Sequence, residues 1–429
     1  MGEILKGATL IELTPPRLEQ ADLRIEGNKI EARGPQLAPK PGDRVTDLRG
    51  RLVMPGLVMA HTHLYSTLAR GMPAPEQPLK TFRDHLEQVW WRLDRALDER
   101  LITLSAQVGA AEALLNGVTT VFDHHASPSF VEGSLAAVRR GVASVGARSV
   151  LCYEISDRNG KGCRDAALRE ADAFLKGGRS PRCAAMVGGD SSFTLDDDSL
   201  DAMVALATRH DVGLHLHVAE SPDDERDARK RFDKGVMERL DEHGVLTPRT
   251  LLVHCTHLSW EELSLAQQRG CWMIHNPRSN MHNSVGYAPA GKFGARKALG
   301  TDGIGSDLIG EAQFAFFKAR EAGFKIDPLH WLAGGQHLSA EIFGQPLGQL
   351  EPGAIADLVL LDYPSPTPLV AQNLTSHVAL GLSASHVDAV MVDGAWRVWA
   401  RQLLSLDYEE LRAKAAEGAR QLWSRMSAA

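Results

Sequence analysis

The chain has 429 residues, of which 44% are hydrophobic and 24% charged, and its formal net charge is −7. This length allows a barrel of about 250 residues beside a smaller domain, and a net negative charge spread along the chain argues against a nucleic-acid partner. The N-terminal residues lack the basic start and apolar core of a signal peptide, and no apolar run approaches the length of a membrane span. We therefore expect a cytoplasmic protein that does not bind a membrane.

Both ends of the chain contain short runs in which polar and apolar residues alternate, with glycines between them. Such runs predict hairpins. They fill the first 52 residues or so and return in AIADLVLLDYP and VDAVMVDGAWRVWA. We expect residues 1–54 and 346–402 to pair into one small β-sandwich domain, with residues 55–345 inserted as a second domain. The amphipathic pattern of residues 403–429 predicts a C-terminal helix.

The middle of the chain alternates β-rich runs with segments that are able to form helices. Eight β–α units predict an α/β fold, a (β/α)8 TIM barrel with the small β-sandwich domain formed from both chain ends beside it. The eight runs are LVMAHTH, VTTVFDHH, ARSVLCYEI, CAAMVGG, VGLHLHVAE, TLLVHC, CWMIHN and ALGTDG.

Polar residues stand at the ends of several of these runs. Barrel enzymes build their sites at the C-terminal ends of their strands, so we expect these side chains to surround one site. They are His61 and His63 at the first run, His217 and Glu220 at the fifth, His254 at the sixth and Asp302 at the eighth.

The histidines predict a metal site. His61 and His63 lie two residues apart on a predicted strand, so both imidazoles point to the same side. Neutral imidazole is a good ligand for zinc and for ferrous iron. With His217 as a third imidazole and Asp302 as a carboxylate, the set leaves one position open for water, as catalytic metal sites do. We expect a divalent metal ion, zinc or iron.

The same group of residues predicts hydrolysis. A divalent ion lowers the pKa of bound water from about 15.7 to near 7, which makes hydroxide available at neutral pH. Attack on an amide-like carbon then needs a base for the proton of the water, an acid for the nitrogen and a donor for the developing charge. Asp302, Glu220 and His254 are the candidates for these roles, in that order.

The motifs PGLVMAHTHL, HVAE, VHCTHL and GTDG together resemble the amidohydrolase superfamily, in its cytosine-deaminase and chlorohydrolase-like branch. Within that branch, WWRLDRALDE, FDHHASP, HNPRSNMHNSVGY and GTDGIGSD resemble the aminohydrolases of the SsnA type. The resemblance implies hydrolysis of a C–N bond, most often deamination of a nitrogen heterocycle, by a homo-oligomer. It implies one metal ion per chain, held by His61, His63, His217 and Asp302, with Glu220 and His254 as catalytic residues.

One segment departs from the pattern of the branch. Relatives usually carry G-x-H-A-P-[FY]-T after the fourth strand, and this chain has GGDSSFT, with Asp190 at the position of the histidine. A carboxylate accepts hydrogen bonds from N–H groups, so we expect a different substrate. Trp90 is a candidate for stacking on a flat ring, and Asn280 is a further candidate for substrate binding. The roles of His124 and His125 stay open.

The sequence leaves three functions open. Deamination of a heterocycle is the first, and opening of a cyclic amide or imidazolone ring by the same water is the second. The third is a catalytically inactive barrel that serves as a binding protein, since barrel folds support unrelated functions. The presence of every predicted ligand and acid–base group argues against the third function.

Overall fold

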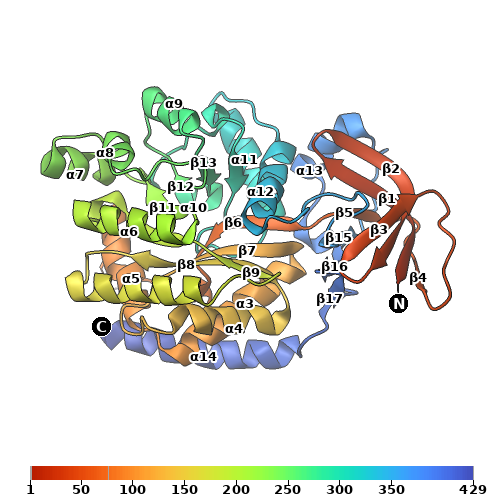
Figure 1. The fold of residues 1–429 in the computed structure, drawn as a ribbon, viewed down its shortest axis with the longest axis horizontal. Coiled ribbons are helices and arrows are strands. Elements are labelled where there is room, and N and C mark those ends of the chain that lie inside the picture. Colours follow the sequence, from red (N-terminus) through yellow and green to blue (C-terminus); the bar gives the residue numbers. More distant parts are fainter. Residues whose placement is uncertain (1, 76, 429) are drawn as a thin grey trace.

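The computed structural model describes residues 2–75 and 77–428, which form two sheets, one of them surrounded by helices (Figure 1). The surrounded sheet has parallel strands in the order β6-β7-β8-β10-β11-β12-β13-β14, with β9 beside β8. A bridge between Thr62 and Asp302 joins the first strand to the segment after the last, so the barrel is nearly closed and the predicted TIM barrel is confirmed. Its strands are β6 (Leu57–Thr62), β7 (Val118–His125), β8 (Arg148–Ile155), β9 (Cys183–Ala185), β10 (Val187–Ser191), β11 (Leu214–Val218), β12 (Leu251–His254), β13 (Trp272–His275) and β14 (Lys297–Leu299).

Helices cover the outside of the barrel, and the last helix of the chain lies along α3 (Figure 1). Two short helices joined by a π-helical turn, Leu86–Trp90, stand between β6 and α3. The helices are α1 (Phe82–His85), α2 (Trp91–Arg95), α3 (Glu99–Leu115), α4 (Ser134–Val145), α5 (Lys161–Lys176), α6 (Asp197–His210), α7 (Asp223–Phe232), α8 (Val236–Glu242), α9 (Trp260–Gln268), α10 (Pro277–His282), α11 (Leu308–Glu321), α12 (Pro328–Phe343), α13 (Leu374–Leu380) and α14 (Tyr408–Ala428).

The second sheet is built from both ends of the chain. Its order is β18-β17-β16-β15-β5-β1-β2-β3, with β4 beside β1, and the antiparallel pair of β5 and β15 joins the two ends. The sheet is mixed, because β1 runs parallel to β4 and β5 but antiparallel to β2. The domain boundaries stay predictions. The strands are β1 (Glu3–Leu13), β2 (Pro16–Glu26), β3 (Lys29–Gly34), β4 (Arg44–Asp47), β5 (Leu52–Pro55), β15 (Leu358–Leu361), β16 (Val387–Val392), β17 (Ala395–Trp399) and β18 (Gln402–Leu403).

Alternation along the barrel strands places polar side chains above an apolar interior. Phe122 on β7, and Val150 and Cys152 on β8, belong to one buried cluster that draws on strands around the barrel. Because side chains two positions apart share a face, His124 and Glu154 continue these faces at the C-terminal ends of the strands. The interior of the barrel therefore ends in a ring of polar groups.

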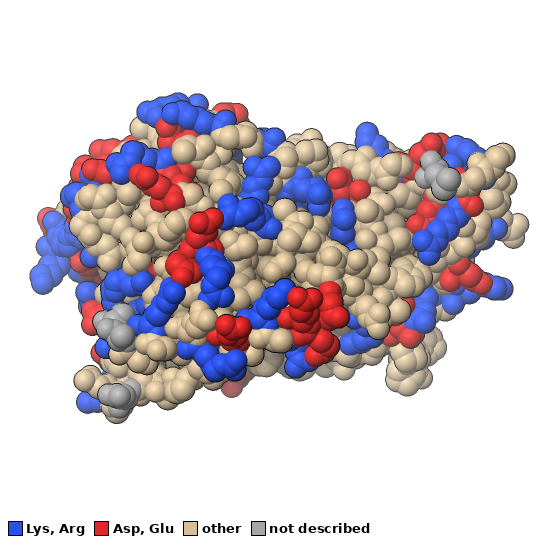
Figure 2. Space-filling model, turned by 90° about the horizontal axis from the view of Figure 1, so that it is seen from below, with Lys and Arg blue, Asp and Glu red and all other residues tan. Residues whose placement is uncertain are grey.

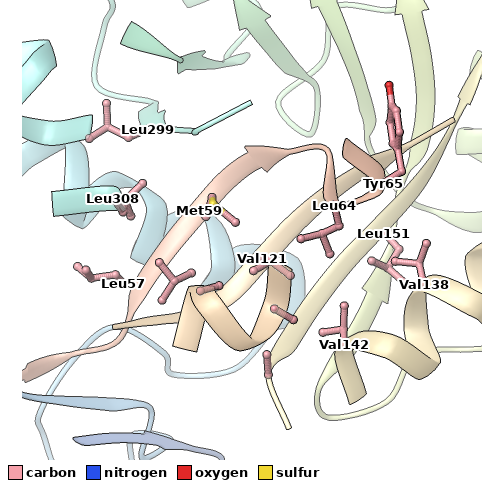
Figure 3. Packing of buried hydrophobic residues seen from close by; sticks show 14 of the residues in the cluster. Leu57, Met59, Leu64, Tyr65, Val121, Val138, Val142, Leu151, Leu299 and Leu308 are labelled. Atoms are coloured by element: carbon pink, nitrogen blue, oxygen red, sulfur yellow. The ribbon is translucent and has the colours of Figure 1, made fainter. Parts of the chain in front are cut away.

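The opposite faces of the same strands pack against the helices. Val121 of β7 and Leu151 of β8 belong to the largest buried cluster, together with Val138 and Val142 of α4 (Figure 3). This layer holds the strands in place from outside, so the polar groups inside are carried by rigid elements.

The surface seen in Figure 2 interleaves basic and acidic side chains, without one continuous field of either sign. Within residues 2–75 and 77–428, no helix combines the length and the apolar character needed to cross a bilayer.

Candidate metal and catalytic site

The four predicted ligands meet at the C-terminal end of the barrel. His63 Nε2 lies 3.2 Å from His217 Nε2 and also 3.2 Å from Asp302 Oδ1. His61 Nε2 lies 3.9 Å from Asp302 Oδ1, and in the described part of the chain this buried atom has no hydrogen-bond partner. All four side chains are buried. Three imidazoles that converge on one carboxylate, with a ring nitrogen left unpaired, fit a divalent cation, because burying such a group without a partner is unfavourable.

Hydrogen bonds on the far side of two rings fix the nitrogen that faces this centre. His63 Nδ1 lies 2.6 Å from the carbonyl oxygen of His124, which can only accept, so Nδ1 carries a proton and Nε2 faces the centre, where it donates to Asp302 without metal and would present a lone pair to a bound metal. His61 Nδ1 lies 2.9 Å from His215 Nε2, and His215 Nδ1 lies 3.7 Å from Cys152 Sγ. When Nδ1 is protonated on both of these rings, His61 Nε2 is also free to bind a metal. Such outer contacts orient metal-binding histidines.

The backbone is bent where the strands deliver these side chains. Ala219 after β11, His254 at the end of β12 and Asp302 after β14 have φ of 49°, 73° and 52°. This left-handed region costs a non-glycine residue on the order of 1–3 kcal/mol, and such strain concentrates at functional sites. In β6 the register with β7 shifts between Met59 and Thr62, and bulges of this kind turn a side chain toward a new direction.

Three groups able to move protons lie beside the ligands. His254 Nε2 lies 3.4 Å from Glu220 Oε2 and 3.9 Å from Asp302 Oδ2. Among the described residues this nitrogen has no hydrogen-bond partner, although it is buried. The three predicted acid–base groups therefore share one small space.

Helix α10 and the residue that follows it contact all of these groups. Ser279 Oγ donates to Asp302 Oδ2, and Asn283 Nδ2 donates to Glu220 Oε1 at 3.3 Å. Asn280 Oδ1 lies 2.8 Å from His254 Nδ1, and the amide nitrogen of Asn280 donates to Thr256 Oγ1 at 3.3 Å. The amide oxygen accepts, so His254 carries its proton on Nδ1 and presents a lone pair at Nε2.

Burial and charge separate the proton affinities of the three groups. Burial and the negative charge of Asp302 raise the pKa of Glu220 well above its ordinary value. Burial alone would raise the pKa of Asp302 as well, but the hydrogen bond from His63 and the nearby imidazoles hold it well below its ordinary value. Burial lowers the pKa of His254. Of the three groups, Glu220 is therefore the one shifted toward its acid form, Asp302 the one held as a carboxylate and His254 the one held as a neutral ring.

A cavity of about 40 Å³ opens above the centre. Trp90 lines it, with its ring centroid 5.3 Å from that of His63, and Asp190 lines it from β10. Phe82, Leu86 and Trp91 come from the segment between β6 and α3 and complete the wall. Two of the predicted substrate-binding residues, Trp90 and Asp190, thus lie in the wall of the cavity, and Asn280 lies behind His254.

The histidines whose roles the sequence left open have partners in the structure. His124 Nε2 lies 3.0 Å from the carbonyl oxygen of His215, and His124 Nδ1 lies 3.1 Å from Glu154 Oε2. His125 Nε2 lies 2.9 Å from Ser127 Oγ. His124 therefore supports the floor of the site, and His125 packs beside Tyr65 and Tyr153.

Several residues of the site were not predicted from the sequence. Glu154 is the next-to-last residue of the third run and shares a face with Cys152, so the expectation that sites form at strand ends would have included it. Ser279 and Asn283 flank Asn280, but their contacts depend on how α10 sits over the barrel. Asp94 also lines the cavity, and nothing in its local sequence marks it.

The sequence of this chain matches the pattern of a known protein family. The sequence pattern of the amidohydrolase family matches residues 52–397. The chain belongs to the amidohydrolase family. This confirms the predicted resemblance at the level of the superfamily, and the relatives described next are deaminases.

Two relatives and one solved structure illustrate the likeness. This amidohydrolase is 32% identical over 419 residues to an 8-oxoguanine deaminase of Pseudomonas aeruginosa, covering 91% of this chain and 92% of the relative. It is 28% identical over 449 residues to a 5-methylthioadenosine/S-adenosylhomocysteine deaminase of Pelotomaculum thermopropionicum, covering 98% and 99%. The crystal structure of an adenosine deaminase from Xanthomonas campestris with bound zinc matches the fold with a TM-score of 0.87 at 24% identity, covering 100% and 99%.

Proposed function

We propose that this amidohydrolase removes an amino group from a nitrogen heterocycle by metal-dependent hydrolysis and releases ammonia. One observation carries the proposal: His61 and His63 approach the carboxylate of Asp302, His217 lies against His63, and Glu220 and His254 stand beside Asp302 at the floor of a cavity. The names of the relatives support the reaction, since both are deaminases of purine compounds.

The proposed cofactor is one zinc ion per chain, held by His61, His63, His217 and Asp302. Zinc suits three imidazoles and one carboxylate, and ferrous iron accepts the same donors. The adenosine deaminase with the matching fold holds zinc, which supports this choice. When bound, the ion supplies a water activated for attack at neutral pH.

The acid–base groups of the chain handle the protons of the reaction. Asp302, whose Oδ2 is held by Ser279, takes a proton from the attacking water. Glu220 is protonated and donates to a ring nitrogen of the substrate, and Asn283 keeps its carboxyl group in place. The lone pair on His254 Nε2 first holds the water by accepting a hydrogen bond. While the proton of the water passes through this ring to Asp302, Nε2 is a donor and stabilises the negative charge that develops on oxygen.

The protons balance in three transfers. As the oxygen of water adds to carbon, Asp302 takes one proton from the water and Glu220 gives its own proton to the ring nitrogen. Asp302 then passes its proton to the amino group, the C–N bond breaks and ammonia leaves, while the remaining hydroxyl proton returns to Glu220 as the carbonyl group forms. Asp302 and Glu220 both face His254, which places all three groups within reach of these transfers.

Several further properties belong to the proposal. Trp90 stacks on the substrate ring, and Asn280 acts by holding His254 in one tautomer. On the motifs of the sequence, we place the chain with the aminohydrolases of the SsnA type and propose a homo-oligomer in the cytoplasm.

Mass spectrometry of zinc-loaded protein with amino-purines, amino-pyrimidines, pterins, triazines and cyclic amides tests the reaction. A product in which hydroxyl replaces amino, with ammonia released, is the expected result. A product equal to substrate plus one water would instead establish ring opening. Protein that neither retains zinc nor gains thermal stability from it would favour the inactive barrel, because a ligand that binds only the folded state must stabilise it.

A further inference from the structure

Beyond the metal ligands, the cavity wall carries an acidic cluster of Asp94 from α2, Glu154 from β8 and Asp190 from β10. The side chains of Asp94, Glu154 and Asp190 are 1%, 6% and 11% exposed, respectively. One cation joins them: Arg158 forms an ion pair with Asp94, and its Nε lies 3.3 Å from Asp190 Oδ2. The guanidinium group of Arg158 also lies over the ring of Trp91, 5.3 Å from its centroid. Three buried carboxylates thus share one guanidinium group.

Two carboxylate oxygens of this cluster are left for a ligand. Ser156 Oγ and Arg158 Nε both approach Oδ2 of Asp190, and Oδ1 accepts no hydrogen bond from the residues that the structure describes. In Asp94, Arg158 occupies Oδ2, and the buried Oδ1 has no partner within the same residues. Leaving the buried Oδ1 of Asp94 without a partner is unfavourable by about 1–3 kcal/mol, so a donor of a bound ligand is the group that satisfies it, and Oδ1 of Asp190 can accept from a second donor.

Carboxylates select the ring edge that faces them. An ionised carboxylate only accepts hydrogen bonds, so it binds an N–H group and repels a ring nitrogen that carries a lone pair. Lactam and urea groups of oxo-substituted rings carry such N–H donors, whereas most ring nitrogens of adenine carry lone pairs.

The size of the cavity also favours a free base. Its volume is about 40 Å³, while a single water needs about 10–15 Å³ on this measure. Any substrate must therefore displace the covering side chains of Phe82, Leu86 and Trp90. A single flat base requires less displacement than a base with a sugar attached.

We propose that Asp190 and Asp94 select a free, oxo-substituted amino heterocycle, such as an aminopurinone or an aminopyrimidinone. Their carboxylates accept hydrogen bonds from ring N–H groups on the edge remote from the amino group that leaves. Arg158 holds both carboxylates in position and partly neutralises them. This inference rests on the proposed deaminase function and adds the substrate class to it.

Paired measurements of binding and turnover on zinc-loaded protein test the inference. The substrates are 8-oxoguanine and isocytosine, a series of N-methylated 8-oxoguanines, and 5′-deoxyadenosine as the sugar-bearing comparison. Binding is measured by calorimetry, and turnover by ammonia release. The expected result is preference for a free oxo base, with a loss of about 10- to 100-fold in affinity when methylation removes an N–H that faces Asp190, as for a hydrogen bond to a charged group.

The variant Asp190→Asn isolates the carboxylate, and Asp198→Asn on the exposed surface of α6 is its matched control. Asp190→Asn is expected to retain zinc, to bind the oxo base about 10- to 100-fold more weakly and to lose the discrimination against the methylated base. The control is expected to match the wild type. Because the methylated series uses wild-type protein, the test does not depend on the folding of the variant.

The outcomes separate the two proposals. An oxo base that binds with this discrimination but releases no ammonia would support the inference and remove the deaminase function. A higher kcat/KM for 5′-deoxyadenosine than for either oxo base would leave the function and overturn the inference. Equal affinity for methylated and unmethylated bases would overturn it as well, and so would the absence of binding by every base in the set.

Discussion

Replacement of Glu220 by glutamine removes one proton from the site and changes little else. Glutamine has nearly the same size, and its amide oxygen can still accept from Asn283 Nδ2, which donates to Glu220 Oε1 at 3.3 Å. The Glu220 side chain is buried, and its Oε2 lies 3.4 Å from His254 Nε2. A neutral amide in place of a buried carboxyl group beside Asp302 adds no charge to the interior, so we expect the variant to fold and to retain its metal.

The expected loss in the variant Glu220→Gln lies in turnover. A positioned acid contributes about 100- to 10,000-fold to a rate, which corresponds to about 3–5 kcal/mol in the barrier. We expect kcat to fall by this factor, with zinc content and the dissociation constant of the substrate changed by less than about threefold, because glutamine preserves the ground-state contacts. Ammonia release, metal analysis and calorimetry measure the three quantities.

The pH profile makes the same test more specific. Burial and Asp302 raise the pKa of Glu220 well above its ordinary value, so the acid form persists through neutral pH. Activity should then fall as the pH rises through that pKa and the proton is lost. Glu220→Gln should lack this alkaline limb, and the exposed Glu261→Gln should behave as the wild type. A Gln variant with a near-normal rate would refute the assignment of Glu220 as the acid.

Three further variants or conditions test the site. His217→Ala should lose most of its bound zinc and the stabilisation that zinc gives, about 2.7 kcal/mol at a hundredfold excess over Kd; full occupancy would exclude His217 as a ligand. Asn280→Ala should lower kcat about tenfold at unchanged zinc content, since His254 loses the partner that fixes its tautomer; a change in KM alone would favour substrate binding instead. Burial alone would lower the pKa of His63, but Asp302 outweighs it and raises that pKa to about 9 without metal. Zinc must displace this proton, so the apparent affinity for zinc, measured in competition with a chelator, should rise about tenfold per pH unit until about pH 9. A flat profile would contradict this.

The sequence predicted the barrel and the composition of its metal-binding end for one physical reason. Parallel strands of a barrel end at the same rim, so residues at the ends of consecutive β-rich runs must lie near one another. His63 and Asp302 are 239 positions apart in the sequence, and two of their side-chain atoms lie 3.2 Å apart in the structure. The same rule extends to Glu154, which continues the inward face of Val150 and Cys152.

Other parts of the site follow from tertiary packing and have no local signal. Asp94 lies on the short helix α2, and Arg158 follows β8 in a loop, so neither belongs to a strand whose alternation could predict its direction. Asn280 was predicted to contact substrate because it follows the seventh strand. Its side chain turns to His254 instead, and whether it also reaches a substrate stays a prediction.

The candidate metal ligands and the acidic cluster come from different elements of the barrel rim, which explains why the sequence suggested the metal site more readily than the substrate. The proposed metal ligands stand on β6, on β11 and just after β14. The backbone before Asp302 packs tightly against β6 and β13: a Cβ added at Gly300 would lie 2.3 Å from Asn276 Oδ1 and 2.8 Å from the carbonyl oxygen of His61. The acidic cluster stands on the neighbouring strands β8 and β10 and on the segment between β6 and α3, and Arg158 forms ion pairs with a carboxylate from each of the three. A family can therefore keep its metal ligands while it exchanges a residue such as Asp190, and the identity of the substrate must be sought in that cluster.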